Sequence, residues 1–185
     1  MYFSDEKVAQ MSAYFLMKRG GCMSHLKLMK LLYLADRESM AQIDEPMTAD
    51  FPVSMKNGPV LSQTYNLMKG ETPSNDWKKW VADIKDNEIE LSAQVERRDD
   101  FDQLSDFDIE VLEKVWAEHG HKTRWALVDY THEHCGEWSD PGYSSIPIDP
   151  RAQFYALGRT PEQAEKLRNI LSERRQLGNI WKQLS

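Results

Sequence analysis

Apolar residues recur at helical spacing through the first forty residues of the chain. Between Ser4, which suits a helix N-cap, and Gly20-Gly21, which suits a helix end, apolar side chains repeat every three or four positions. A second run of the same kind follows Ser24 and predicts a helix over residues 25–40. Both helices are expected to pack in the core, the second one through Leu28, Leu31, Leu32 and Ala35, with Lys27 and Lys30 exposed on its polar face.

The rest of the chain predicts one β element among further helices. Pro59 suits the first position of a short helix that ends at Gly70, because its missing N–H costs nothing there. Residues 80–85 and 88–92 alternate apolar and polar side chains around Asp86-Asn87, which predicts a β-hairpin. Further helices are expected after Ser105, after Thr123 and from Thr160 to about Leu177. The expected fold class is mainly α (α+β): a single-domain helical bundle with one small antiparallel β-hairpin.

Composition and charge argue against membrane-spanning, secreted and nucleic-acid-binding proteins. The 185 residues contain no apolar run near the ~20 residues that span a bilayer and no secretory signal, and two cysteines make no disulfide framework, so the cytoplasm is expected. The net charge of −7 is concentrated in residues 81–115, with twelve acidic and four basic side chains. A uniform basic face for nucleic acid is therefore disfavoured. The acidic segment is either a solvated face or a docking surface for a basic partner, through Asp99, Asp100, Asp102, Asp106 and Asp108.

A cluster of histidines raises the question of a metal or catalytic site. Four of the five histidines and one of the two cysteines lie within residues 119–135. The histidines come in pairs two residues apart, a spacing that points side chains roughly 200° apart on a helix. Both pairs also coincide with predicted helix ends, where the helix dipole favours basic residues. We therefore expect no metal, no cofactor and no enzymatic activity; the alternative is a metal-dependent hydrolase built on His119, His121, His132, His134 and Cys135.

Three segments, read in order, resemble a known family. They are LKLMKLLYLAD at 26–36, KNGPV at 56–60 with Tyr65 soon after, and VDYTHEHCGEW at 128–138. Together they resemble the Panacea domain of SocA-like antitoxins, which includes phage-associated proteins, over about residues 1–140. Many members carry proline before the final tryptophan, where this chain has Glu137. Residues 141–185 lie outside the resemblance and are expected to form a loop and a helix that pack on the domain or extend it.

The resemblance implies a non-enzymatic antitoxin that binds a cognate protein toxin. Toxins opposed by the family include translation-inhibiting, alarmone-synthetase-like ones, and delivery of the toxin to a AAA+ protease is a second mode. A phage-encoded inhibitor of a host factor is a further alternative. The resemblance gives Thr131 and His132 a structural or recognition role, in which Thr131 bonds a carbonyl one turn back and His132 orients the loop of Trp138. Neither nucleic acid nor membrane is an expected partner. The predicted partner-binding residues are Lys27, Lys30, Tyr33, Pro59, Tyr65, Asp99, Asp100, Asp102, Thr131, His132 and Trp138. Among these, Tyr33, Tyr65 and Trp138 are the expected aromatic anchors.

Overall fold

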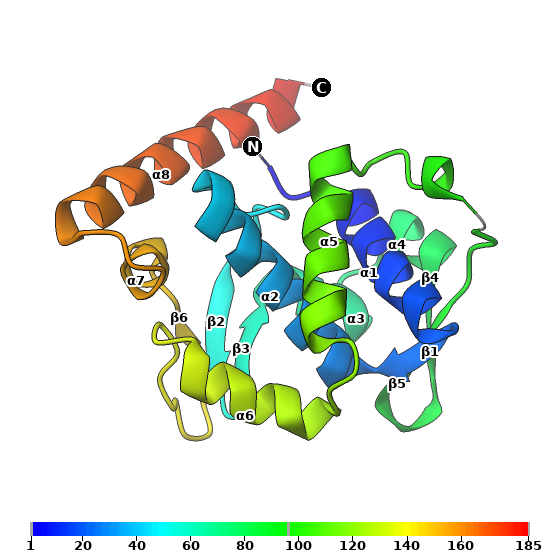
Figure 1. Cartoon of the computed structure of the whole chain (residues 1–185). Helices are drawn as coiled ribbons and strands as arrows, with labels where there is room; N and C mark the ends of the chain where they lie inside the picture. Colours follow the sequence, from blue (N-terminus) through cyan, green and yellow to red (C-terminus); the bar gives the residue numbers. More distant parts are fainter. Residues whose placement is uncertain (1, 96, 185) are drawn as a thin grey trace.

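The fold is built around one long central helix. The computed structural model describes residues 2–95 and 97–184, and Figure 1 shows α2 in the middle of them, with α5 and α6 nearby and a small sheet to either side. The helices are α1 (Asp5–Arg19), α2 (His25–Ile43), α3 (Ser62–Met68), α4 (Asn75–Trp80), α5 (Asp106–His119), α6 (Arg124–His134), α7 (Pro150–Ala156) and α8 (Pro161–Leu184), with short 3₁₀ turns at Lys85–Asn87 and Arg98–Asp100. The mainly α fold class is thus confirmed.

Four of the predicted helix starts are confirmed by capping hydrogen bonds. Ser4, Ser24 and Thr123 each accept a hydrogen bond from the backbone N–H three residues on. Ser105 and Asp108 form a reciprocal capping box at the start of α5. These bonds satisfy backbone donors that a helix leaves without an internal partner, so the sequence places each start correctly.

Helix α2 is buried on almost every side. Its predicted stripe has no exposed surface at Leu28, Leu31, Leu32 and Ala35, which confirms these four core positions. Helices α1, α5 and α6 and strands β1 (Cys22–Ser24) and β3 (Gly58–Leu61) all contact α2. A helix enclosed in this way has no wet face to receive polar side chains. The predicted exposure of Lys27 and Lys30 is accordingly wrong: both are buried.

The β structure is larger than the sequence predicts. The predicted hairpin forms from β4 (Val81–Ile84) and β5 (Glu88–Leu91), and β1 joins it in the strand order β1-β5-β4. A second antiparallel sheet has the order β3-β2-β6, from β3, β2 (Pro52–Met55) and β6 (Ile146–Pro147). The predicted helical position of Pro59 is wrong, since it lies in β3 opposite Ser54 and α3 begins only at Ser62. An edge strand tolerates a proline because the missing N–H leaves no ladder bond unmade.

The C-terminal residues pack as a second, smaller layer. A small apolar cluster of Met40, Phe154, Ala164 and Leu171 joins α7 and α8 to the end of α2. Arg175 of α8 donates a hydrogen bond to the carbonyl of Asp50 at 2.7 Å. The predicted end of α8 near Leu177 is wrong, because the helix continues through the buried Gly178 to Leu184. One glycine costs a helix only about 1 kcal/mol relative to alanine, which the turns on either side outweigh.

Within the described part of the chain, no helix combines the length and the apolar composition that crossing a bilayer requires.

Candidate functional site

The three motif segments meet at the buried Lys30. The Lys30 ammonium donates a hydrogen bond to the carbonyl of Pro59 at 2.7 Å, which ties α2 to the β2–β3 hairpin. Gly58 lies directly above it: a Cβ on this glycine would be 2.6 Å from the Thr131 hydroxyl and 2.8 Å from the Lys30 nitrogen. The Thr131 hydroxyl donates in turn to the carbonyl of Val128 at 3.0 Å, as the sequence predicts. The motifs therefore join α2, the hairpin and α6 at one point.

Burial lowers the pKa of both motif lysines. Lys30 has no exposed surface, and burial lowers its pKa to about 7, although the nearby Cys135 thiol acts in the opposite direction. Burial also lowers the pKa of Lys27, with a further contribution from Arg19. The Lys27 ammonium donates to the carbonyls of Gly120 and Lys122 at 2.6 and 2.8 Å. Both lysines thus hold the fold together from inside. Lys30 has no exposed surface for a partner to contact, whereas Lys27 borders a surface depression.

The loop after α6 is held by a buried carboxylate. Glu137 accepts a 2.5 Å hydrogen bond from the Tyr33 hydroxyl and a 2.9 Å bond from Arg37 Nε. Tyr33 has no exposed surface, so the structure does not present it to a partner as the predicted aromatic anchor. The ion pair between Glu137 and Arg37 fastens the loop to α2 directly.

Trp138 connects the loop after α6 to the β2–β3 hairpin. Its indole N–H donates to the carbonyl of Met55 at 3.0 Å, and its ring stacks on His132 with the centroids 3.8 Å apart. The His132 ring thus lies against the loop that carries Trp138. Both side chains remain partly exposed, while Pro59 and Thr131 are buried.

The histidine and cysteine cluster does not converge on a common point. The rings of His119 and His134 both contact the ring of Tyr130, with centroids 4.6 and 4.3 Å away, whereas the ring of His132 stacks on Trp138. Burial, helped by Lys122, lowers the pKa of His119 to about 4, and burial raises the pKa of the Cys135 thiol to about 12. Among the residues that the structure describes, no three His, Cys, Asp or Glu side chains are grouped as metal ligands would be. The geometry therefore gives the alternative of a metal-dependent hydrolase no ligand set.

Several side chains of the acidic segment make contacts with nearby residues. Asp102 bonds the Gln10 amide at 2.6 Å, Asp100 accepts from the Arg97 N–H, and Asp106 pairs with Arg98 at 2.8 Å. Asp108, predicted to face a partner, is instead buried in its capping box and in an ion pair with Lys7 at 3.0 Å. Asp99, Asp102 and Asp106 remain exposed and Asp100 is half-buried.

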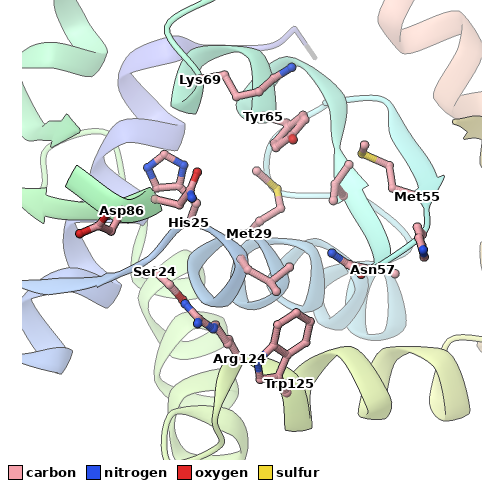
Figure 2. A pocket seen from close by; sticks show the side chains of 15 residues that line it. Ser24, His25, Met29, Met55, Asn57, Tyr65, Lys69, Asp86, Arg124 and Trp125 are labelled. Atoms are coloured by element: carbon pink, nitrogen blue, oxygen red, sulfur yellow. The ribbon is translucent and has the colours of Figure 1, made fainter. Parts of the chain in front are cut away.

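A groove of about 490 Å³ opens beside the motif residues. Figure 2 shows Met29 of α2 between two walls. One carries Tyr65 of α3 and Lys69, which follows this helix directly, and the other carries Arg124 and Trp125 from the start of α6. The β2–β3 turn supplies Lys56, Asn57 and Gly58 to the lining. Of the predicted partner-binding residues only Tyr65 lines this groove. The other residues that line the groove were not predicted from the sequence. Arg124-Trp125, directly after the Thr123 cap, could have been recognised, because arginine and tryptophan are enriched at interfaces.

Comparisons with known proteins address the family. The chain matches the family described as "Antitoxin SocA-like, Panacea domain" over residues 28–139, more than half of its length, and the match includes most of the groove lining. A search of curated proteins and a search of solved structures returned no match. The matched segment contains two of the three motif regions in full and the first one from residue 28 on, and it supports an antitoxin-like role. The chain therefore belongs to the family of SocA-like antitoxins with a Panacea domain.

Proposed function

We propose that this protein is an antitoxin that neutralises a cognate protein toxin by binding it directly, without chemistry of its own. The observation that carries the proposal is that some residues of the family match make contacts inside the molecule, while the elements that they join surround an open groove. Lys30, Gly58 and Thr131 make their contacts inside the molecule, where they fix α2, the β2–β3 hairpin and α6 to one another. The same elements frame an open groove. A rigid frame around an open groove suits a binding module, because little order must be gained on association.

Co-expression tests this function. The product of the open reading frame next to this gene is expected to arrest growth when expressed alone, and co-expression of this chain should restore growth. The two proteins should then co-purify as one complex in size-exclusion chromatography. A neighbouring product that is harmless, or a rescue without a complex, would contradict the proposal and leave inhibition of a host factor as the better explanation.

The mode of neutralisation follows from an assay with purified proteins. We propose direct blocking, and stoichiometric antitoxin should then abolish toxin activity with no other protein present. If inhibition instead required a AAA+ protease and ATP, the protein would act as an adaptor that delivers the toxin for degradation. The toxin itself, including any alarmone-synthetase-like activity, is identified by the same assay.

Two surfaces can serve the interaction. The first is the acidic segment, where Asp99, Asp100 and Asp102 are proposed to flank a basic region of the toxin and to speed encounter. The second is the groove with Tyr65 in its wall. The two surfaces carry opposite charge, so experiments can separate them.

A further inference from the structure

The lining of the groove differs from the rest of the molecule in charge. A second depression of about 330 Å³ adjoins the groove, and the two share Ser24 and Arg124. Six Lys or Arg residues and only two acidic residues line the pair of depressions, in a chain whose net charge is −7. Among the residues that the structure describes, neither Lys56 nor Arg124 forms an ion pair. Their charge is available to an incoming anion.

The walls of the groove pair each aromatic ring with a cation. Lys69 lies 4.5 Å above the centroid of the Tyr65 ring, and the Arg124 guanidinium lies 5.7 Å from that of Trp125. Trp125 is 55% exposed, so more than half of a large aromatic side chain is free to be covered. Tryptophan, tyrosine and arginine are the residue types that most often dominate binding energy at protein interfaces.

The floor of the groove is apolar and adaptable. Met29 and Met55 lie beside Val60, and methionine side chains are flexible enough to pack against partners of different shape. The volume of the groove falls in the range of about 300–1,000 Å³ that suits bound side chains or small ligands. Figure 2 shows Met29 between Tyr65 on one side and Trp125 on the other.

We propose that the groove binds an acidic segment of the toxin that also carries apolar side chains. The proposal rests on the proposed antitoxin function and names the site and the chemistry of the partner. The apolar side chains of the segment cover Met29 and Trp125, while its carboxylates face Lys56 and Arg124. A short acidic segment with apolar side chains can contact both the basic rim and the apolar floor of the groove.

Other occupants fit less well. Nucleic acid would meet the basic rim but leave the apolar floor of the groove without a partner. A second copy of this chain would have to bring its acidic segment, and none of the exposed large apolar side chains of the described residues lies in that segment. An acidic, partly apolar segment of another protein meets neither obstacle.

Charge reversal and truncation at the groove test the proposal. The double variant Lys56→Glu/Arg124→Glu reverses two exposed charges, and an acidic residue at the start of α6 is favoured by the helix dipole, so folding is preserved. The variant Trp125→Ala removes the exposed ring. Matched controls are Lys78→Glu/Lys166→Glu, two exposed cations outside the groove, and Tyr155→Ala, an exposed aromatic residue of α7. Thermal unfolding verifies that every variant is folded.

Binding of the purified neighbouring toxin, measured by biolayer interferometry, gives the readout. Both groove variants should weaken binding about tenfold or more, whereas both controls stay within about twofold of the parent protein. A groove variant that binds as tightly as the parent overturns the groove proposal and leaves the antitoxin function standing. A parent protein that neither binds nor neutralises the toxin overturns both.

A cross-linking experiment identifies the occupant. Asn57 is exposed on the rim, and Asn57→p-benzoylphenylalanine places a photoreactive ring there. Mass spectrometry of the irradiated complex should find a toxin segment that contains aspartate or glutamate next to apolar residues. Cross-links to a lysine-rich segment, to co-purified RNA or to a second copy of this chain would overturn the proposal.

Discussion

Gly58 turns the β2–β3 hairpin with a φ of 93°, directly above the Lys30 ammonium and the Thr131 hydroxyl. Gly58→Ala would combine a backbone strained by its Cβ with a contact under 3.0 Å to two buried polar atoms. These effects predict a loss of about 2–5 kcal/mol in the free energy of unfolding, measured by chemical denaturation. Gly70 is the matched control, because its φ is also positive and a Cβ there meets nothing within 4 Å. Equal losses in Gly58→Ala and Gly70→Ala would show that the close packing at Gly58 contributes nothing.

Lys30 makes stability depend on pH in a defined direction. Its pKa of about 7 in the folded protein lies below the value of about 10.4 in an unfolded chain, so between these values the unfolded chain binds more protons. Stability therefore rises with pH through this window and is lost as pH falls towards 7. Lys30→Met should remove up to about 1.4 kcal/mol per pH unit of this slope. Denaturation at pH 7, 8 and 9 checks it, and parallel curves for parent and variant would contradict a depressed pKa.

Individual residues could be predicted from sequence where their role is local. The bond from Thr131 to a carbonyl one turn back and the leucine stripe of α2 depend only on helical spacing, and both are confirmed. The burial of Lys27 and Lys30 could not be predicted in this way. A helical wheel assigns lysines to a wet face, and only the packing of β3 and α6 onto α2 shows that no such face exists.

Secondary structure elements with strong local signals were predictable, and elements that depend on distant partners were not. The hairpin of β4 and β5 follows from alternation around a turn dipeptide. By contrast, β6 is two residues long and pairs with β2 from about ninety positions away, so no local pattern reveals it. The edge position of β3, which tolerates Pro59, likewise follows only from the sheet order.

The candidate site shows the same limit. The motif segments that resemble the family were visible in the sequence, and they do meet in space. The groove beside them draws its walls from α3 and α6 and its floor from α2 and the hairpin. Residues such as Lys56, Lys69 and Trp125 share no spacing in the sequence, so only the packed helices bring them together.

The whole molecule carries its charge unevenly, and this arrangement predicts two kinetic effects. The basic groove is proposed to hold the toxin, where desolvated contacts govern dissociation, and the acidic segment is proposed to attract it, where exposed charges govern association. The pKa of Asp102 is lowered, chiefly by its hydrogen bond from Gln10, so this side chain is ionised at neutral pH. Asparagine retains an oxygen that can accept the same bond, so neutralising this position removes charge with little disturbance of the fold.

The triple variant Asp99→Asn/Asp100→Asn/Asp102→Asn should slow association with the toxin several-fold at low salt, because long-range attraction is lost. The effect should nearly vanish above about 0.5 M salt, where screening limits electrostatic forces to a few ångströms. Stopped-flow mixing at several salt concentrations measures the association rate. Asp76→Asn/Glu133→Gln/Glu173→Gln is the matched control, since it neutralises three exposed acidic residues outside the segment. An equal slowing in both variants would mean that net charge alone steers the toxin, and no slowing in either would exclude the acidic segment from the docking surface.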